Sequence, residues 1–434
     1  MKIINGLWFC EVKLDDIRVL KDQSKMIWKV KIVVTETPME VYMFKAKMVE
    51  AKLRYSEDDF EGAIQCYEEL RNEDQQRFNR CCKYNYLWSL YKSRIYTKYA
   101  FLDSNIDQTM EAVDHIIMYL DSSEILFQIT VMSVIRYLEK KNEYDSKELN
   151  NWLDKLEPDV LTNESRTYVT DDGKQITYEG NKEKWYALKS KVCLELELYD
   201  DCIEVSNKAL SVLVEFTHNN DVWFKWRLAN SFYKKGDLIT GLELFIEVTS
   251  KKKDWFVYAE IADIYSKMEN EEEALNNYIT ALYKSGKDEY KVKLFNKMAN
   301  FIRKTDEASA MQLEDYSVKI RLKNSWHMDE NLTRYYNQNK ERIDNIEINK
   351  IKNNVDQIVD RYNIKMKKSY EGIVVKLFAN GKSGFINSGG DSFYFKHNVM
   401  KSRHTIMIGD HVRFFIEKSY DYKKKQDSNI AIIL

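Results

Sequence analysis

Two stretches in the middle of the chain decide its fold. They are "WRLANSFYKKGDLITGLELFIEV", starting at Trp226, and "YAEIADIYSKMENEEEALNNYITAL", starting at Tyr258. Their apolar and small residues recur at a constant offset of 33 residues. An internal repeat of this length indicates stacked copies of one supersecondary unit. The recurring pairs are Leu228 and Ile261, Phe232 and Tyr265, Gly241 and Ala274, Phe245 and Tyr278, and Val248 and Ala281.

The third pair, Gly241 and Ala274, consists of small residues, which suits a point where two antiparallel helices approach closely. An aromatic residue follows four positions later, on the same helix face. This pattern resembles the tetratricopeptide repeat, a helix-turn-helix unit of about 34 residues. Residues 184–210 fit it with one extra residue in the turn, and residues 48–70 fit it with Ala63 and Tyr67 in the small and aromatic positions. Because one repeat cannot bury its apolar face alone, the sequence predicts a superhelical array over residues 41–328.

Three further segments flank or interrupt this array. Residues 1–40 contain "LWFCEVKL" and "IWKVKIVV", which are compatible with a paired β-hairpin and equally with an N-terminal helix that leads into the array. Residues 166–180 alternate around Asp172-Gly173, which predicts an inserted hairpin. Residues 329–368 place isoleucine and valine at helical spacing on a polar background, which predicts an amphipathic linker helix that connects or caps the array.

The last segment, residues 369–434, has a different texture. It holds five β-type runs separated by glycine turns, including "GKSGFINSGGDSFYFKH" from Gly381 to His397. Five short strands close most simply into a small barrel, which leaves no exposed strand edge. The predicted fold class is therefore mainly α, a tetratricopeptide-like superhelix followed by a small all-β barrel of the oligonucleotide-binding, cold-shock-like kind.

The barrel segment resembles the cold-shock domain and related S1-like domains. The family opening G-x-V-K-W-F is echoed by residues 372–378 with one residue added, and the later G-x-x-V-x-F by residues 409–414. Its two ribonucleoprotein motifs are echoed by residues 381–386 and 392–396. Leu377 stands where the family has a stacking tryptophan, Ser383 and Lys396 replace aromatic residues, and a phenylalanine, Phe395, replaces the usual histidine.

The resemblance implies an aromatic platform for bases. Aromatic rings on a sheet stack on the bases of single-stranded nucleic acid, and lysines beside them meet the phosphates. Phe393 and Phe395 are two residues apart and so share a sheet face. A structural alternative is that the phenylalanines pack against the helical array. The predicted nucleic-acid-binding residues are Lys376, Lys382, Phe385, Phe393, Phe395 and Lys396.

Charge is distributed unevenly along the chain. From Lys368 to Leu434 there are eleven basic and six acidic residues, a net charge of +5, whereas the whole chain carries -2. A local excess of positive charge favours a polyanion as the partner of the barrel rather than of the whole protein.

The repeats have their own candidate surface. In tetratricopeptide arrays the first helix of each repeat lines the concave groove, so the pattern predicts a partner-binding surface. An ordinary solvated helix face is the alternative for each residue. The predicted groove residues are Asn230, Tyr233, Lys234, Asp263, Ser266 and Lys267.

Other classes of function find no motif. The chain has no phosphate-binding loop, serine-hydrolase elbow or H-E-x-x-H sequence, so we expect no catalytic residues, no cofactor and no metal. Six scattered cysteines without a C-x-x-C pair indicate reduced, structural thiols in a cytoplasmic protein. No apolar run approaches the length of a membrane span, and no signal-peptide core is found at the start.

The sequence therefore predicts a non-enzymatic adaptor. Its barrel would bind single-stranded nucleic acid, RNA in preference to DNA, while the array recruits a protein partner or a second copy of the chain. The alternatives are a purely protein-binding scaffold and an unrecognised enzyme such as a nuclease. The combination resembles bacterial proteins in which tetratricopeptide repeats precede an S1 or cold-shock-like domain, some of them linked to antiviral defence, and this resemblance implies a role of that kind.

Overall fold

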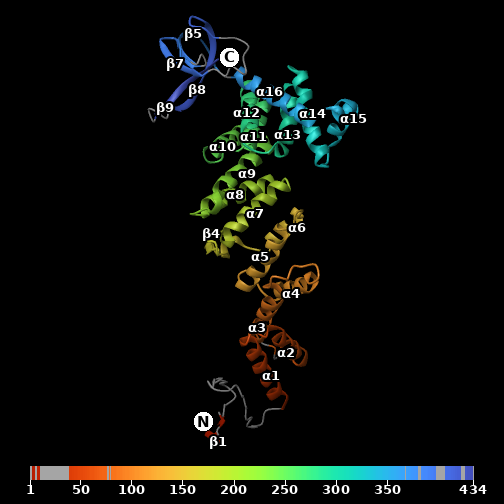
Figure 1. Cartoon of the computed structure of the whole chain (residues 1–434). Helices are drawn as coiled ribbons and strands as arrows, with labels where there is room; N and C mark the ends of the chain where they lie inside the picture. Colours follow the sequence, from red (N-terminus) through yellow and green to blue (C-terminus); the bar gives the residue numbers. More distant parts are fainter. Residues whose placement is uncertain are drawn as a thin grey trace. The chain divides into compact units, whose positions relative to one another are not determined.

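The computed structural model describes residues 2–4, 7–9, 39–75, 78, 80–366, 368–379, 383–396, 406–421 and 426–433 (Figure 1). It divides into two compact units. The first comprises Met1–Leu198 with Leu213–Thr217, and the second comprises Tyr199–Val212 with His218–Leu434.

The first unit is mainly a succession of helices. The small and aromatic positions predicted there, Ala63 and Tyr67, are both fully buried. Its helices are α1 (Met39–Ser56), α2 (Phe60–Glu73), α3 (Arg80–Leu90), a π-helix (Tyr91–Ile95), α4 (Ile106–Tyr119), α5 (Ile125–Glu139), α6 (Ser146–Leu153), a 3-10 turn (Pro158–Val160) and α7 (Asn181–Glu195).

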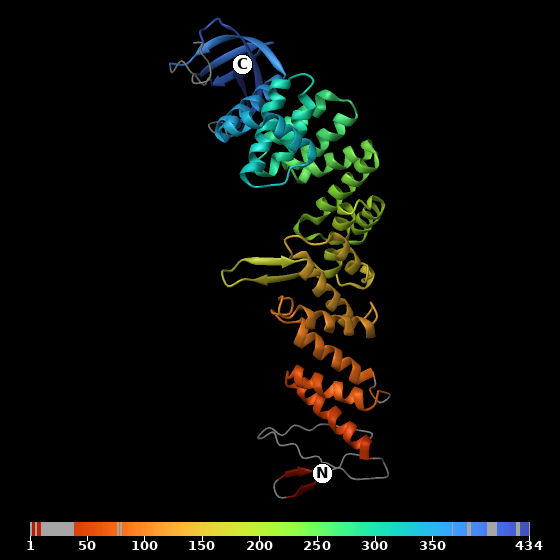
Figure 2. The ribbon, with the colours of Figure 1, turned by 90° about the vertical axis from the view of Figure 1, so that its right-hand side faces the viewer.

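Two small antiparallel hairpins belong to this unit. β1 (Lys2–Ile4) pairs with β2 (Leu7–Phe9), whereas the predicted strand at residues 27–34 lies outside the described residues. β3 (Arg166–Val169) pairs with β4 (Gln175–Tyr178) in the inserted segment, where Figure 2 shows a two-stranded ribbon. Its turn contains Gly173 at φ +78°, a conformation that glycine adopts without steric cost.

The second unit contains the clear repeats. Its helices are α8 (Tyr199–Val212), α9 (Asn220–Lys235), α10 (Leu238–Lys251), α11 (Trp255–Lys267), α12 (Glu271–Tyr283), α13 (Val292–Ile302), α14 (Glu307–Lys323), α15 (Glu330–Asn345) and α16 (Ile348–Met366), with 3-10 turns at Thr217–Asn219 and Asp288–Lys291.

The 33-residue offset has a direct structural meaning. Asp237 caps α10 by accepting a hydrogen bond from the Thr240 amide at 3.1 Å, and Asn270 caps α12 in the same way from Glu273 at 3.2 Å. A Cβ on Gly241 would lie 3.2 Å from the Ala229 carbonyl oxygen, so the small residue permits the close approach of α9 and α10. The recurring positions are therefore the caps and contact points of successive helix pairs.

The segment predicted as one linker helix forms two. α15 ends at Asn345, and α16 begins at Ile348. Four residues on one face of α16 enter the core that α11 to α14 share. The amphipathic pattern thus reports a helix that closes the repeat stack. The four residues are Ile351, Val355, Ile358 and Tyr362.

The C-terminal strands form a closed barrel in the order β5-β6-β7-β9-β8. β7 and β9 pair in parallel, and every other neighbouring pair of these strands is antiparallel. The core contains Val374, Ile386, Phe395, Phe414 and Ala431. The predicted fold class is confirmed. The strands are β5 (Ser369–Leu377), β6 (Ser383–Ser388), β7 (Asp391–Lys396), β8 (His411–Asp421) and β9 (Gln426–Ile433).

Candidate nucleic-acid and partner-binding surfaces

The outer face of β5, β6 and β7 carries an aromatic cluster. Cross-strand pairing aligns Lys376 with Phe385 and Phe385 with Tyr394, so these three side chains form one row across the sheet. Phe378 follows the end of β5, where its amide donates to the Ser383 carbonyl at 2.9 Å. The row and Phe378 together form what we call the barrel platform.

The rings of the platform touch one another. The Phe378 and Phe385 centroids are 5.8 Å apart, as are those of Phe385 and Tyr394, and Phe378 lies 6.4 Å from Tyr394. Phe378 and Tyr394 expose 38% and 36% of their surface, and Phe385 is half-buried. Large aromatic side chains usually lose more surface than this on folding, so the platform offers open ring faces for a ligand.

Positive charge accompanies the rings. The Lys376 ammonium lies 5.6 Å from the Phe378 ring centroid. Lys396, at the end of β7, is exposed, and Lys382 lies outside the described residues. The structure therefore places Lys376 and Lys396 on strands of the platform, as the sequence predicted for a phosphate-contacting role.

Phe393 and Phe395 share a face, as predicted, but it is the inner one. Phe395 is fully buried in the barrel core, and Phe393 packs against that core with its ring 5.6 Å from Phe414. A five-strand barrel needs bulky inward residues from each strand to fill its interior. The fully buried ring of Phe395 has no free face for a base, and the exposed aromatic residue of β7 is the intervening Tyr394.

On β5 as well, the exposed aromatic residue lies one position away from the one that the family motif indicates, because a β-bulge interrupts the strand. Val374 pairs with Ile386 and Lys376 pairs with Phe385, which leaves Val375 without an opposite residue. The bulge holds the residue by which this strand exceeds the family motif. It directs Leu377 into the core and leaves Phe378 exposed. Sequence reasoning missed Phe378 and Tyr394, and the added residue was the signal for the first.

The predicted groove residues lie on α9 and α11 of the second unit. Tyr233 is 7% exposed, and the ammonium groups of Lys267 and Lys234 lie 4.3 Å and 5.7 Å from its ring centroid. Asn230 is buried and donates to the Trp226 carbonyl within its own helix, so its amide serves α9 itself. Ser266 is half-buried. Tyr233, Lys234 and Lys267 are thus brought together.

Asp263 joins a buried polar network rather than an open surface. It accepts a hydrogen bond from the Tyr278 hydroxyl at 2.6 Å and one from the Lys297 ammonium. Burial would lower the pKa of Lys297, but the Glu260 and Asp263 carboxylates outweigh it and raise that pKa. Lys297 is therefore charged and fixes Asp263. Sequence reasoning missed Lys297 because it lies on a helix beyond the aligned repeats.

Glu260, also on α11, was missed as well. Burial raises the pKa of its carboxyl. The positive charges of Lys297 and Lys234 partly offset this rise, whereas the negative charge of Asp263 adds to it. Its position one helical turn before Asp263 places both acids beside the Tyr233 ring and its two lysines. Two exposed lysines, Lys234 and Lys267, therefore lie beside a largely buried network of Glu260, Asp263 and Lys297.

Within the described ranges, no group of three or more His, Cys, Asp or Glu side chains is placed to hold a metal ion. Among the described helices, none has the length and apolar composition needed to cross a bilayer. Cys66, Cys82, Cys193 and Cys202 are buried and form no disulfide.

One family model matches part of the helical region. A family model described as a domain of unknown function, DUF7017, matches residues 222–354, and no curated protein sequence matches the chain. The solved structure of YrrB, described as a tetratricopeptide-repeat protein with an unusual peptide-binding site, is 13% identical over 56% of this chain and 91% of its own, with a TM-score of 0.24.

Two further solved structures give similar values. The apo form of RapI is 13% identical over 74% of this chain and 99% of its own, with a TM-score of 0.33. Yeast Tom70 is 15% identical over 71% of this chain and 60% of its own, with a TM-score of 0.26. At this level of similarity none of the three bears on function. The architecture stated above, tetratricopeptide-like repeats followed by a five-strand barrel, rests on the chain's own repeats and strands.

Proposed function

We propose that the protein is a non-enzymatic adaptor whose barrel binds single-stranded nucleic acid while its helical repeats bind a protein partner. The observation that carries the first part is the barrel platform. Three mutually contacting rings and a lysine lie over the first three strands of a five-strand barrel, with Phe385 and Tyr394 on the second and third strands, the face on which oligonucleotide-binding barrels take their ligands.

The chemistry of the platform suits bases better than peptide. Each stacked base contributes roughly 1–3 kcal/mol on an aromatic ring, whatever its sequence. The net charge of +5 over residues 368–434 supplies attraction to phosphates. A peptide ligand would instead need a hydrophobic groove or an unpaired strand edge, and closure of the barrel leaves no such edge.

Salt dependence tests this proposal. Fluorescence anisotropy of the full chain with a labelled single-stranded RNA, and with the DNA of the same sequence, should show binding that weakens steeply as salt rises, because phosphate contacts release counterions. Tighter binding to RNA would support the preference stated above. Absence of binding to both at low salt would contradict the nucleic-acid role and leave the protein-binding scaffold as the function.

The groove on α9 and α11 supports the second part of the proposal. Lys234 and Lys267 are exposed and lie over the ring of the buried Tyr233, so both ammonium groups can turn to a ligand. Affinity purification with wild-type chain should retain a protein that is lost when Lys234 and Lys267 are both changed to Glu. Equal recovery by both chains would place the partner elsewhere.

An enzymatic role has its own test. Incubation of the purified chain with labelled RNA and a divalent metal ion should leave the RNA intact. Cleavage that persists through further purification and disappears on substitution of one acidic residue would replace the adaptor with a nuclease.

A further inference from the structure

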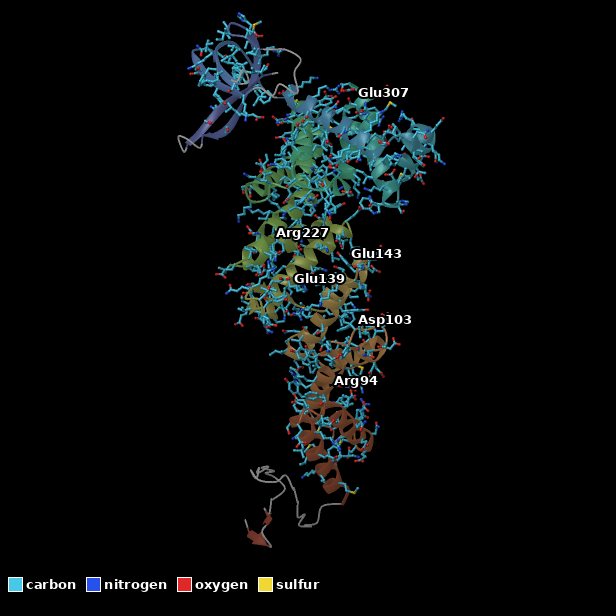
Figure 3. The ribbon with its side chains drawn as sticks, viewed as in Figure 1. Arg94, Asp103, Glu139, Glu143, Arg227 and Glu307 are labelled. Atoms are coloured by element: carbon cyan, nitrogen blue, oxygen red, sulfur yellow. The ribbon has the colours of Figure 1, made fainter. Side chains whose placement is uncertain are left out.

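The first unit contains a stretch with no carboxylate. The twenty residues from Lys83 to Leu102 include no Asp or Glu, although acids make up 69 of the 434 residues of the chain. About three would be expected in a stretch of this length if acids were evenly distributed. Figure 3 marks Arg94 within the stretch and Asp103 just after its end. The cations are Lys83, Lys92, Arg94 and Lys98, and the aromatic residues are Tyr84, Tyr86, Trp88, Tyr91, Tyr96, Tyr99 and Phe101.

Four of these rings form a continuous series along α3 and the π-helix. Successive centroids are 6.1 Å apart from Tyr84 to Trp88, 5.9 Å from Trp88 to Tyr91, and 5.8 Å from Tyr91 to Tyr96. The two ends are open, since Tyr84 exposes 44% of its surface and Tyr96 exposes 68%. Tyr99, which is 53% exposed, follows three residues after the last ring. We call these four rings, with Tyr99 and the lysines over them, the α3 face.

The π-helix completes the series. Its wider turn joins the Tyr96 amide to the Tyr91 carbonyl at 2.7 Å, a spacing of five residues instead of four. That turn brings the Tyr96 ring onto the Tyr91 ring, with the two planes inclined by 21°. In an ordinary α-helix a residue five positions on points well away from the first. A rare backbone feature therefore keeps the last exposed ring in line with the others.

Of the four cations in the stretch, the three lysines are available to a ligand and the arginine is not. Arg94 is engaged by Glu61, at 3.4 Å between Nε and Oε1. Among the described residues, Lys83, Lys92 and Lys98 form no salt bridge, and their ammonium groups lie over tyrosine rings. Lys92 is 5.1 Å from the Tyr96 centroid, and Lys98 is 4.8 Å from that of Tyr99. Such contacts at exposed rings are weak enough for each lysine to turn to a phosphate.

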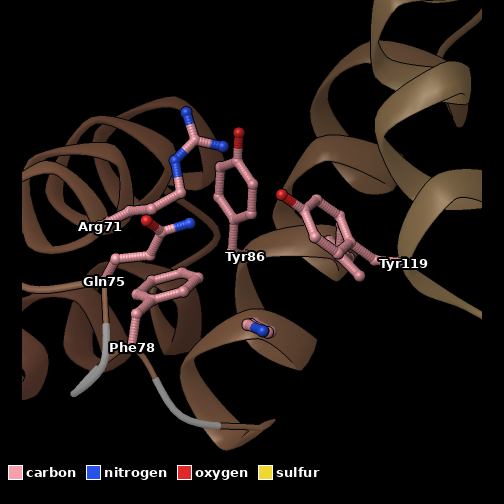
Figure 4. A pocket seen from close by; sticks show the side chains of 7 residues that line it. Arg71, Gln75, Phe78, Tyr86 and Tyr119 are labelled. Carbon is pink, nitrogen blue, oxygen red and sulfur yellow. The ribbon is translucent and has the colours of Figure 1, made fainter.

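A small pocket adjoins the face at Lys83 (Figure 4). Its walls are aromatic, and the Arg71 guanidinium lies 5.6 Å above the Tyr86 ring centroid. Burial raises the pKa of Tyr86 to about 12, so its hydroxyl stays protonated and donates to Glu68 at 3.3 Å. Arg71 forms no salt bridge within the described part of the unit. The pocket thus adds a second free cation beside Lys83. It is lined by Arg71, Gln75, Phe78, Lys83, Tyr86, Leu87 and Tyr119.

We propose that the α3 face is a second binding surface for single-stranded nucleic acid, carried by the helical part of the chain and independent of the barrel. The exposed rings of Tyr84, Tyr96 and Tyr99 occur together with unpaired lysines, which is the combination that non-specific single-strand binding uses. Between them, the half-buried Trp88 and the buried Tyr91 support the series from within. The stretch from Lys83 to Leu102 adds no carboxylate of its own to repel a phosphate backbone, and of the two acids that reach it from α2, Glu61 is paired with Arg94 and Glu68 accepts from Tyr86. The inference does not rest on the function proposed for the barrel.

The competing occupant is an acidic protein surface, which the same cations would attract. It would gain little from the open faces of Tyr96 and Tyr99, whereas a base stacks on them. The choice between the two is therefore made by the tyrosines, and the lysines alone do not decide it.

The test uses the full chain with Phe385→Ala and Tyr394→Ala, which removes the barrel platform. Binding of a labelled single-stranded RNA of about twelve nucleotides is measured by anisotropy. We expect residual binding that weakens roughly tenfold with Tyr96→Ala plus Tyr99→Ala, and by a similar factor with Lys92→Glu plus Lys98→Glu. The matched controls are Tyr168→Ala plus Tyr178→Ala, exposed to a similar degree on the β3–β4 hairpin, and Lys147→Glu plus Lys174→Glu.

The outcomes separate the two surfaces. Residual binding lost only with the α3-face changes supports this proposal, even if the barrel proves not to bind. Equal binding by the α3-face variants and their controls overturns it. Binding that depends on the lysines and not on the tyrosines, and that heparin or an acidic protein matches, also overturns it. Circular dichroism of each variant should retain the helical signal of the parent chain, because none of the substituted side chains is buried.

Discussion

The barrel platform and the α3 face use the same kinds of residue but build them in opposite ways. The platform gathers Phe378, Phe385 and Tyr394 from three strands, so it exists only while the strand register holds. The α3 face takes its series of rings from one continuous segment, Tyr84 to Tyr96, in which each ring touches the next. The first surface depends on the barrel as a whole, and the second depends on local helix geometry.

That difference teaches where each surface is vulnerable. A change in the barrel interior should remove the platform without altering any platform residue. On the α3 face, only changes to the rings, the lysines or the helical turn between them should matter. The predictions below test this contrast, beginning with the largest expected effect.

Gly384→Val should disrupt the barrel platform by forcing a side chain into the barrel interior beneath it. A Cβ at Gly384 would lie 1.9 Å from the Lys376 carbonyl oxygen and 2.9 Å from the Phe395 ring, both fixed by the barrel. We expect a loss of more than about 4 kcal/mol of barrel stability, measured by urea unfolding. Ser392→Val, at an exposed strand position, should change stability by less than about 0.5 kcal/mol. Equal stability of the two variants would refute the packing described here.

Phe395→Ala compared with Tyr394→Ala sharpens the contrast at neighbouring positions. The Phe395→Ala chain should lose about 3–5 kcal/mol of unfolding free energy, because removal of this buried ring leaves a cavity. The Tyr394→Ala chain should keep nearly its full stability, because this side chain is exposed, and its binding of RNA should weaken by roughly 1–3 kcal/mol. Thermal unfolding and anisotropy of both chains check this. A large loss of stability with Tyr394→Ala and a large loss of RNA binding with Phe395→Ala would mean that Tyr394 points into the barrel and Phe395 points outward.

A substitution at Asp288 perturbs the helices while leaving both aromatic surfaces in place. Burial would raise the pKa of this carboxyl, but hydrogen bonds from Lys352 and Tyr316, each at 2.6 Å, outweigh it and lower that pKa. The ionised form therefore stabilises the docking of α16 above the ordinary aspartate pKa, and this contribution is lost as pH falls through the lowered value.

Asp288→Asn should accordingly cost about 1.5–3 kcal/mol at neutral pH and less in acid, measured by urea unfolding across the pH range. RNA binding at neutral pH should stay within twofold of wild type. A loss of stability that does not vary with pH would contradict the assignment of the ionised carboxylate.

Insertion of one alanine after Ser93 tests the local character of the α3 face. The added residue lengthens the spacing from Tyr91 to Tyr96 from five positions to six, which neither an α-helical nor a π-helical turn places on one face, so Tyr96 should rotate away from Tyr91. We expect the residual RNA binding of the platform-deficient chain to fall several-fold while helical content is retained. Insertion of an alanine after Asp103, in the turn that follows the α3 face, is the matched control. Unchanged binding after the insertion at Ser93 would show that the stacked geometry is not used.

Sequence predicted the helical part better than the strands, for a physical reason. A repeat constrains each position twice, so Gly241 and Ala274 identify one another as contact points, and the caps Asp237 and Asn270 fall at the same offset. A strand alternates with period two, so an error of one residue exchanges its faces. The choice of Phe393 and Phe395 over Tyr394 is such an error.

The remaining features depend on contacts that no local pattern reveals. The bulge at Val375 changes the alternation along β5, and only its pairing with β6 shows this. Lys297 reaches Asp263 from another helix. The series of rings at Tyr84 to Tyr96 is spaced irregularly in sequence, and the π-helical turn that aligns it has no simple composition signal.

The central claim, that the barrel platform binds nucleic acid, is tested most directly by one comparison. Anisotropy with single-stranded RNA is measured for the full chain and for Phe385→Ala plus Tyr394→Ala, with thermal unfolding of both. The account predicts that the variant keeps its unfolding temperature and loses the larger part of its affinity, leaving only the weaker binding assigned to the α3 face. Undiminished affinity in a folded variant would contradict it.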